Sequence, residues 1–536
     1  MKTLLYSISI IASFHSFSQV LDPEEYVLEM EPMTITNTPG IHSFSWGIDD
    51  EGRWLIVGGR IDGLHQRQPF AAFLEADNNK FAFVIDPISQ ESWAADLNVL
   101  PSSIYEQLQS TNQEFFQRDS TLYIFGGYGY SATALDHITY PYVTAIDINS
   151  LCDAIVDGNP ISTYFRQLED EKFKVTGGQI GYLDSVFYLV GGQLFDGRYN
   201  PMGPDHGPGF TQEYTNEIRK FKLVDNGVSL TVTDYSEVND SLNLHRRDYN
   251  MLPQIFPNGE HGFTVFTGVF DPNDLPFLNT VDVFENSYSV NPSFNQLLSQ
   301  YHSAKFSVYD SISSVNQSIF FGGMSQFYYE NGILIEDVEV PFVKTVSKVN
   351  RYNDGSMEEI VLDYLEMPAL LGAGAEFIPT GDYWIDNEIL DIRSVPASKT
   401  LVGYIYGGIE SSAKNIFFIN DGNQSSASNT IFKVFINKSL VGLQEEVIEG
   451  LPIENLKVYP NPAKKDIKLE FVVPVSAEVN YKIIGLKGEL VKNDSLGMLE
   501  NGFYTTEIDV SDFDSGKYII QLFNGQYWVH YNFVKK

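Results

Sequence analysis

Short apolar segments that end in two adjacent glycines recur along the chain. The segment TLYIFGG alternates apolar and aromatic side chains from Leu122 to Phe125 and then stops at Gly126 and Gly127. This content of β-branched and aromatic residues favours a strand that is buried on both faces. The same pattern recurs as RWLIVGG (53–59), VFYLVGG (186–192), SIFFGG (318–323) and VGYIYGG (402–408), with FTVFTG (263–268) as a degenerate copy. The spacing averages about 70 residues, a period typical of propeller blades or solenoids.

Each copy stands between other strand patterns. A preceding strand is predicted at residues 41–48, 113–119, 177–184, 246–256, 302–310 and 372–379. After a loop of variable length, a third strand is predicted at residues 80–86, 142–148, 216–224, 278–284, 343–352 and 430–436. A fourth is recognisable in several units, as at 161–168 and 229–238. Four antiparallel strands make one blade, so the sequence predicts an all-β, six-bladed propeller.

The glycine pairs also have a predicted mechanical role. Strands of neighbouring blades crowd together near the central axis, where a side chain would collide with adjacent backbone, and glycine also permits the conformation that starts the next loop. We therefore interpret the pairs as packing features rather than as chemistry.

These repeats resemble the kelch repeat, whose second strand ends in a diglycine and whose third strand carries a pattern like FVIDPISQESW (83–93). The resemblance covers roughly residues 26–440 and implies a kelch-type, galactose-oxidase-like propeller. Two features depart from the family: the repeats exceed the usual kelch period of about 50 residues, and the characteristic tryptophan survives clearly only as Trp93. We place the propeller at residues 19–440.

The first and last segments of the propeller sequence predict how the ring of blades closes. The last blade has three strands before the chain leaves it, whereas the segment at 25–36 precedes the first blade without a partner of its own. We expect this segment to supply the outer strand of blade six, because closure removes the exposed edge of an open ring.

The first residues are typical of an export signal. Lys2 is followed by the apolar segment 4–14 and by small residues at 16–19, which predicts a signal peptide at residues 1–18. No other stretch approaches about 18 uninterrupted apolar residues, so we expect no membrane span. Cys152, the single cysteine, cannot form an intramolecular disulfide, so packing must supply the stability.

The C-terminal segment differs in character from the repeats. Beyond an acidic linker at 441–452, residues 453–536 contain alternating strand patterns that suit a small β-sandwich. This segment resembles the C-terminal sorting domain of the type IX secretion system of Bacteroidota. The matched motif residues are Tyr459, Pro460, Asn461, Pro462, Gly488 and Gly516. The resemblance implies export across the outer membrane and, as partners, the type IX machinery and a sortase-like peptidase that removes the domain. The expected location is the cell surface or the medium.

Charge narrows the range of partners. The 34 Lys and Arg residues against 70 Asp and Glu give a net charge of -36, so nucleic acid is an improbable ligand. We expect an acidic, monomeric protein.

Candidate ligand contacts lie in the loops between the second and third strands, which should all leave one face of the ring. Several of these loops are long and aromatic, and aromatic planes suit stacking on sugar rings or anchoring a protein loop. The predicted ligand-binding residues are Tyr128, Tyr130, Tyr140, Phe195, Tyr199, Phe327 and Tyr328. The alternative is that these aromatic residues merely pack their own loops.

Enzyme signatures are sparse. The histidines are scattered without an HExxH motif, and no G-x-S-x-G motif or P-loop is present. We predict no catalytic residue, metal or cofactor, and a protein that binds a glycan or a protein rather than an enzyme. The alternative function is a sugar-modifying enzyme, mutarotase-like or oxidase-like, on the same propeller. Arg, Glu and His converging at the mouth of the central channel would favour that alternative.

Overall fold

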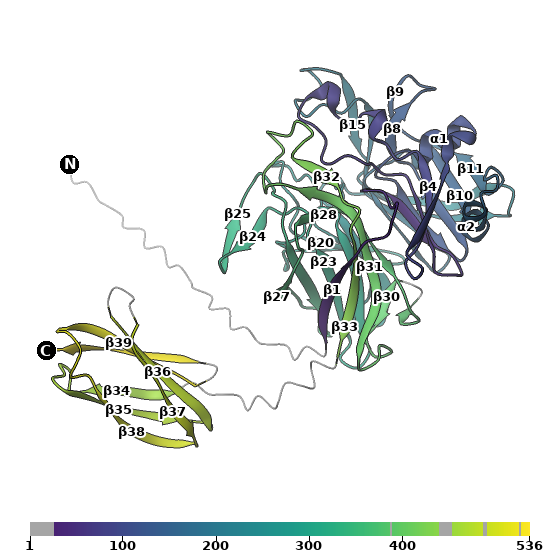
Figure 1. The fold of residues 1–536 in the computed structure, drawn as a ribbon. Coiled ribbons are helices and arrows are strands. Elements are labelled where there is room, and N and C mark those ends of the chain that lie inside the picture. Colours follow the sequence, from purple (N-terminus) through teal and green to yellow (C-terminus); the bar gives the residue numbers. More distant parts are fainter. Residues whose placement is uncertain (1–25, 386–387, 439–452, 486–489, 525–526) are drawn as a thin grey trace, which may run out of the picture. The chain divides into compact units, whose positions relative to one another are not determined.

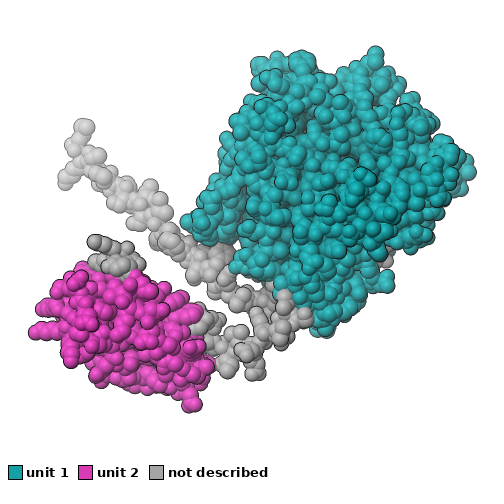
Figure 2. Space-filling model, in the orientation of Figure 1, with its two compact units in different colours: residues 1–439 teal, residues 440–536 magenta. Residues whose placement is uncertain are grey.

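The computed structural model describes residues 26–385, 388–438, 453–485, 490–524 and 527–536. The chain divides into two compact units, residues 1–439 and 440–536 (Figure 2). The predicted signal peptide at 1–18 and the predicted linker at 441–452 lie outside the described residues.

The first unit is a six-bladed β-propeller in which each blade contains four antiparallel strands (Figure 1). The sheet of blade five is extended by two further strands, β29 (Trp384–Ile385) and β30 (Ile389–Asp391), and that of blade six by one. Blade one contains β2 (Ser45–Ile48), β3 (Trp54–Val57), β4 (Phe81–Asp86) and β5 (Glu91–Asp96). Blade two contains β6 (Glu114–Arg118), β7 (Thr121–Phe125), β10 (Tyr142–Asp147) and β11 (Phe165–Glu169). Blade three contains β12 (Gln179–Leu183), β13 (Val186–Val190), β16 (Glu217–Asp225) and β17 (Leu230–Asn239).

The remaining blades repeat this order. Blade four contains β18 (Asn250–Ile255), β19 (His261–Phe266), β20 (Thr280–Val283) and β21 (Tyr288–Asn291). Blade five contains β22 (Ala304–Asp310), β23 (Val315–Phe321), β26 (Thr345–Arg351) and β27 (Met357–Glu366). Blade six contains β28 (Leu370–Pro379), β31 (Lys399–Ser411), β33 (Ile431–Asn437) and β1 (Val27–Met33).

The N-terminal strand β1 completes blade six. It pairs antiparallel with β33 from Val27–Asn437 to Met33–Ile431, and Figure 1 shows the two strands side by side. Leu28 is buried in the core between blades five and six, and Lys399 forms ion pairs with two glutamates of β1. The outer edge of blade six is therefore covered by the other end of the propeller chain.

The glycine pairs join each blade to the next. In blade two, the amide of Gly127 donates a hydrogen bond to the carbonyl of Val175 in the following blade, at 2.9 Å. A Cβ atom on Gly126 would lie 2.0 Å from that same carbonyl oxygen, and both glycines have positive φ. Any other residue would clash there and strain the backbone, which explains why the pair recurs.

Additional elements decorate one end of the blades. The loops between second and third strands carry the hairpins β8 (Tyr128–Ser131) with β9 (Asp136–Thr139), β14 (Gln193–Gly197) with β15 (Phe210–Tyr214), and β24 (Phe327–Glu330) with β25 (Ile333–Glu336). In blade six, β32 (Ser425–Ala427) pairs with β31. We call this end of the ring the loop face; it comprises residues 60–79, 128–141, 193–215, 269–277, 324–341 and 409–428.

Helices are few in the described residues. The α-helices are α1 (Ser102–Leu108) and α2 (Ile148–Asp157), and short 3-10 turns occupy Pro69–Ala71, Glu75–Asp77, Leu97–Val99 and Glu171–Phe173. In α2, the side chain of Asp147 caps the N-terminus, left-handed Gly158 ends the helix, and Cys152 is fully buried. None of the described helices is long and apolar enough to cross a membrane.

The second unit is a small β-sandwich. One sheet contains β34 (Glu454–Tyr459), β35 (Asp466–Val473) and β38 (Gly502–Asp509). The other contains β37 (Leu490–Leu499), β36 (Ala477–Gly485), β39 (Gly516–Phe523) and β40 (Trp528–Lys535). Alternate residues of these strands, such as Ile467, Leu469 and Phe471, are buried between the sheets.

The motif at 459–463 is hydrogen-bonded to β40, the last strand of the sandwich. The amide of Ala463 donates to the carbonyl of Val534 at 2.7 Å, and the side-chain oxygen of Asn461 accepts from the Val534 amide at 2.9 Å. Gly516 opens β39 and pairs with Lys535, whereas Gly488 lies outside the described residues. Motif residues that are far apart in sequence thus meet along β40.

Candidate functional site

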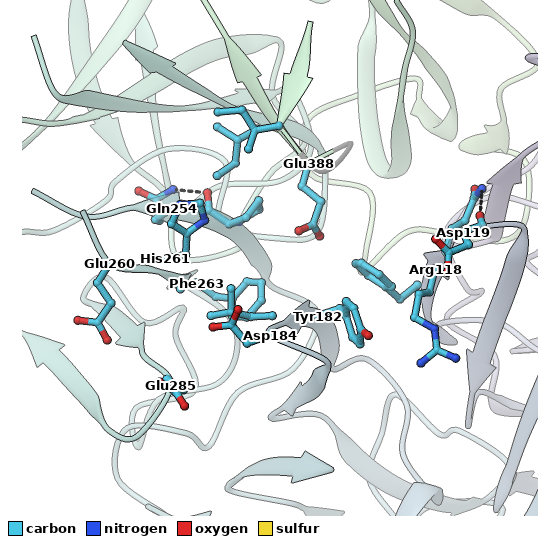
Figure 3. A pocket seen from close by; sticks show the side chains of 17 residues that line it. Arg118, Asp119, Tyr182, Asp184, Gln254, Glu260, His261, Phe263, Glu285 and Glu388 are labelled. Atoms are coloured by element: carbon cyan, nitrogen blue, oxygen red, sulfur yellow. Dashed lines mark hydrogen bonds between the residues drawn. The ribbon is translucent and has the colours of Figure 1, made fainter. Parts of the chain in front are cut away.

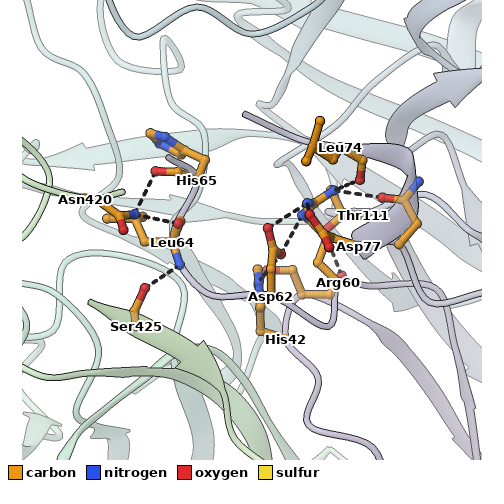
Figure 4. A network of polar contacts seen from close by, with 12 residues as sticks. His42, Arg60, Asp62, Leu64, His65, Leu74, Asp77, Thr111, Asn420 and Ser425 are labelled. Atoms are coloured by element: carbon orange, nitrogen blue, oxygen red, sulfur yellow. Dashed lines mark hydrogen bonds and ion pairs between the residues drawn. The ribbon is translucent and has the colours of Figure 1, made fainter. Parts of the chain in front are cut away.

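Polar and aromatic side chains gather in three regions of the propeller: a pocket near the ends of the innermost strands (Figure 3), the loop face (Figure 4) and a cluster at the central axis. Strands within a blade are antiparallel, so successive connections leave from opposite ends of the blade. The loop face and the pocket therefore lie at opposite ends of the ring.

Three of the seven predicted aromatic residues are buried inside the loop face. Tyr128, Tyr140 and Phe195 are 5%, 1% and 4% exposed. The hydroxyl of Tyr128 donates to the carbonyl of Gly197 at 2.8 Å, and the hydroxyl of Tyr140 donates to the carbonyl of Tyr130 at 2.9 Å. Burial raises the pKa of both phenols well above the ordinary value. In these loops the three side chains act as internal supports.

Two others are half-buried in an aromatic group above blades one to three. The ring of Tyr199 lies 4.6 Å from that of His65 and 5.6 Å from that of Phe73. Tyr130 stands beside His137, with ring centroids 5.4 Å apart. Burial lowers the pKa of His65 to about 4, so this imidazole is neutral at neutral pH. The structure brings Tyr130 and Tyr199 into the same loop assembly.

The last two lie on the hairpin of blade five. Phe327 and Tyr328 are half-buried on β24, and the ammonium of Lys414 lies 4.1 Å from the centre of the Tyr328 ring. That ammonium also pairs with Glu330 at 2.7 Å. The described residues show no ring contact between this pair and the aromatic group of blades one to three.

An ionic network supports the loop face from below (Figure 4). The guanidinium of Arg60, 2% exposed, donates to both carboxylate oxygens of Asp62, at 2.8 and 2.7 Å, and to Asn78 at 2.8 Å. Burial acts to raise the pKa of Asp62, but His42, whose Nε2 lies 3.7 Å away, and the hydrogen bonds from Arg60 lower it to about 2. The carboxylate therefore stays ionised and holds the start of the first loop.

The same figure shows how blade six joins this network. The side-chain amide of Asn420 donates to the carbonyls of Leu64 and His65, at 2.6 and 3.0 Å. The hydroxyl of Ser425 accepts from the Leu64 amide at 2.9 Å. Loops from the first and last blades are thereby fixed to one another.

A closed ring of backbone hydrogen bonds surrounds the central axis beneath these loops. In each blade, one residue at the start of the inner strand donates its amide to the corresponding carbonyl of the neighbouring blade, at 2.7 to 3.3 Å. The participating residues, which we call the axial ring, are Ser43, Asn112, Gly177, Asp248, His302 and Gly374. All of them except His302 have positive φ. Small or amide-like side chains are suited to that conformation, which accounts for most of the residue types.

Side chains of both charges converge at this ring. Arg247 forms an ion pair with Asp248, whose carboxylate also accepts from Asn112 at 3.2 Å. His302 Nε2 lies 2.6 Å from Glu376 Oε1, and Gln179 lies 3.3 Å from the other imidazole nitrogen. We call this set the axial cluster: Asn112, Gln179, Arg247, Asp248, His302 and Glu376.

Partial burial strengthens the electrostatics of the axial cluster. Burial acts to raise the pKa of Glu376, but His302 and Lys305 hold it below its ordinary value. Burial lowers the pKa of the Lys305 ammonium, and the nearby carboxylate of Glu376 offsets part of that decrease. The cluster thus presents donors and acceptors of both charges, and a histidine–carboxylate pair that can move a proton.

Sequence analysis did not find the axial cluster. Its members lie in five different blades, each in or next to an inner strand, and none forms a local motif. A signal was available in the residues that precede the inner strands, where Ser, Asn, Gly and Asp recur at equivalent positions. Aligning the repeats on their glycine pairs would have brought those positions into register.

Glu114 lies beside this region, between blades two and three. Its side chain is 2% exposed, and Oε1 accepts from the amide of Gly178 at 2.7 Å. Oε2 has no hydrogen-bond partner among the described residues. Burial raises the pKa of this carboxyl to about 8, so the folded protein keeps it protonated at neutral pH.

Glu114→Gln is expected to make the fold less sensitive to alkali. Because the folded pKa exceeds the ordinary one, the unfolded chain releases a proton that the folded chain keeps, and stability falls as the pH rises from 5 to 9. A shift from 4.5 to about 8 corresponds to a loss of about 4 kcal/mol over that range. Thermal melts should show a smaller pH-dependent loss for Glu114→Gln than for wild type. The exposed control Glu213→Gln should behave as wild type, and parallel profiles for all three proteins would contradict the assignment.

Within the described ranges, no three His, Cys, Asp or Glu side chains are grouped closely enough to hold a metal ion.

Comparison with known families identifies the C-terminal unit. Residues 457–536 match the family model of the secretion system C-terminal sorting domain. The chain thus carries a type IX sorting domain, the mark of proteins that this system exports to the cell surface or the medium, and it is a client of the type IX machinery. No curated protein sequence matches the chain.

Solved structures give more distant similarities. The structure of YjhT is 13% identical, with 74% of this chain and 99% of that chain covered and a TM-score of 0.41. A fungal alcohol oxidase of the AA5 family, in complex with copper, is 8% identical, with coverage of 95% and 99% and a TM-score of 0.36. PorZ, a surface component of the type-IX secretion system of Porphyromonas gingivalis, is 8% identical, with coverage of 91% and 81% and a TM-score of 0.13. No functional residue is carried over from these structures.

Proposed function

We propose that this exported protein is a kelch-type propeller that binds a glycan or a protein ligand through its loop face. It acts as a monomer, after a signal peptide at 1–18 directs it across the inner membrane. A sortase-like peptidase of the type IX system then removes the sorting domain, which begins near residue 453, after the linker.

This proposal rests on a difference between the two ends of the ring: the loop face carries extra structure. The loop face bears extra hairpins in blades two, three and five, and ionic and amide contacts hold its loops in place. A surface prepared in this way gives a ligand rigid anchors at low entropic cost. Tyr130, Tyr199, Phe327 and Tyr328 supply half-exposed aromatic surface there.

Within the proposed site the seven aromatic residues have two roles. Tyr130 and Tyr328 are direct anchors, with Tyr199 and Phe327 beside them. Tyr128, Tyr140 and Phe195 position the loops from below and do not touch the ligand. Half-buried aromatic rings that are backed by packed neighbours are typical of binding hot spots.

Replacement of Tyr130 and Tyr328 by alanine should weaken ligand binding by about 1–3 kcal/mol for each true anchor. Stability should fall less than in a Tyr128→Ala variant, because the rings of Tyr130 and Tyr328 are half-buried rather than buried. A glycan array and a surface-protein array probed with the full chain would identify the ligand, and titration calorimetry would measure the loss.

Two variants make this test decisive. Tyr128→Ala should lower the melting temperature, because it removes a buried hydroxyl and ring. Ile312→Ala, an exposed position in the β22–β23 turn at the opposite end of the ring, should change neither binding nor stability. A large stability loss in Tyr130→Ala and Tyr328→Ala with binding intact would exclude the loop face as the binding surface.

The axial cluster favours a second candidate function, a sugar-modifying enzyme of mutarotase or oxidase type. Arg247, His302 and Glu376 combine charge recognition with a group that can exchange protons. If the chain is such an enzyme, Glu376→Gln should abolish conversion of a bound sugar, followed by NMR, while binding persists. Conversion that is unaffected by Glu376→Gln would exclude a catalytic role for the pair.

A further inference from the structure

One lysine interrupts an otherwise apolar set of positions on the inner strands. Lys305 lies on β22 of blade five, three residues beyond His302 of the axial ring. At the same distance from the axial ring, the other five blades carry apolar side chains: Trp46, Phe115, Ile180, Met251 and Phe377. Packing between blades favours an apolar residue at such a position, because burying an ammonium is costly unless it is paired. Packing therefore does not account for Lys305.

The side chain of Lys305 has no partner in the fold. Among the residues that the structure describes, its ammonium forms no hydrogen bond, ion pair or cation–π contact. Lys174 and Lys414, by contrast, pair with carboxylates at 2.8 and 2.7 Å. Burial lowers the pKa of the Lys305 ammonium, so a larger share of this residue is neutral amine than at an exposed position. The side chain keeps some exposure, which leaves it open to a small molecule.

A pair that can transfer protons lies beside this amine. His302 Nε2 is 2.6 Å from Oε1 of Glu376, and Glu376 is only 7% exposed. Glu376 attracts the Lys305 ammonium electrostatically without forming an ion pair with it. An imidazole in contact with a carboxylate can give and take a proton near neutral pH. Lys305 thus combines a free amine with a neighbouring acid–base pair.

A second donor near Glu376 also lacks a partner. The indole Nε1 of Trp46, on β2 of blade one, is buried and completes no hydrogen bond with a described residue. Burial acts to raise the pKa of Glu376, and the indole of Trp46 is among the groups that lower it, which places it close to the carboxylate. A buried N–H without an acceptor is rare in folded proteins. A ligand oxygen would satisfy it.

The two unpartnered groups together fit a carbonyl compound. An N–H donates to the oxygen of a carbonyl group and draws electron density from its carbon. The lone pair of a neutral lysine amine attacks that carbon, which is the usual route to a Schiff base. A carboxylate ligand would also accept the N–H bond, but it would not use the free amine as a nucleophile.

We propose that Lys305 is a covalent binding site for a small aldehyde, such as a short hydroxyaldehyde, which it holds as an imine. The Lys305 nitrogen forms a bond to the aldehyde carbon, and the carbonyl electrons move to the oxygen, which faces the Trp46 N–H. One proton passes from nitrogen to this oxygen. Protonated His302 then supplies a second proton, the oxygen leaves as water, and His302 takes back the remaining N–H proton. Amine and aldehyde thus give imine and water, with no oxidant or reductant required.

The site goes beyond the proposed function, because it uses no residue of the loop face. It shares His302 and Glu376 with the second candidate function but requires no conversion of a sugar. Tyr130→Ala and Tyr328→Ala should therefore leave the reactivity of Lys305 unchanged. Failure of the loop face as a binding surface and failure of this site are separate outcomes.

The test is reductive trapping of the imine in the full chain. The protein is incubated at pH 7 with glycolaldehyde and sodium cyanoborohydride, which reduces an imine to a stable secondary amine, and the modified lysines are mapped by mass spectrometry over time. Lys305 should acquire the hydroxyethyl group at least tenfold faster than Lys222, an exposed lysine of β16 that pairs with Asp234. Each unit by which a pKa falls toward the working pH raises the fraction of free amine about tenfold.

Variants test the roles of the neighbouring groups. Trp46→Phe keeps an aromatic ring but removes the N–H, and Glu376→Gln removes the acid–base pair. Each should slow labelling of Lys305 several-fold and leave labelling of Lys222 unchanged. Lys305→Met should abolish the adduct at this position, whereas the matched control Lys222→Met should alter the rate at Lys305 less than twofold.

The map of the wild-type protein decides the question even if a variant melts early. The proposal is wrong if Lys305 of the wild type is labelled no faster than Lys222. It is also wrong if Trp46→Phe and Glu376→Gln, when folded, are both labelled at Lys305 at the wild-type rate.

Discussion

Deletion of residues 19–36 should make the propeller aggregate or unfold. The deletion removes β1, which carries seven consecutive backbone pairings with β33. It also removes the buried side chains of Leu28, Met33 and Ile35. At about 1.5–3 kcal/mol for each buried apolar side chain, the loss is comparable with the whole stability of many domains. Thermal melts and size-exclusion chromatography would measure both consequences.

Point variants separate loss of packing from loss of the strand. Leu28→Asp should reproduce most of the deletion, because it places a charge in the core between blades five and six. Glu31→Gln changes an exposed position on the same strand and should leave the melting temperature within a few degrees of wild type. Adding a peptide of residues 25–36 should restore the deleted protein. A truncated protein that stays monomeric with an unchanged melting temperature would contradict this account of closure.

The propeller could be predicted from the sequence because each blade needs the same residues, a pair of glycines, at the same place. The positions of Gly126 and Gly127 tolerate no other residue, since one lies against the carbonyl of the next blade and both have positive φ. The same constraint applies in the other blades that carry the pair, and it leaves a visible pattern. In blade four, Thr267 replaces the first glycine and also has positive φ, which explains why that copy looks degenerate.

The candidate site could be predicted only in part, because burial depends on contacts between distant residues. Sequence analysis placed Tyr128 in a loop, but the partner that holds its hydroxyl, Gly197, is in another blade. Arg247 and His302 belong to the same cluster only because the ring brings their blades together, so no local sequence pattern predicts them. The sequence likewise does not reveal that β30, between the first two strands of blade six, pairs in parallel with β22 of blade five.

Export is the other property for which we expect an all-or-none effect. A chain that lacks residues 453–536 should fold its propeller and remain in the periplasm of a host that has the type IX system. The expectation follows from the match of residues 457–536 to the sorting domain family, whose members are exported by that system. Cell fractionation and immunoblotting would locate the protein, and appearance of the truncated chain in the medium at the wild-type level would exclude the assignment.

A single substitution in the sorting domain should reduce export without abolishing it. Asn461 accepts a hydrogen bond from the Val534 amide at 2.9 Å and donates one to the Asn532 carbonyl at 3.1 Å, so it fastens β40 to the motif. Asn461→Ala should loosen that strand and lower the exported fraction several-fold, if the machinery recognises a surface that includes β40. The control Asn493→Ala, at an exposed position on β37, should be exported normally. If both variants are exported equally well, recognition depends on a part of the sandwich other than the junction between the motif and β40.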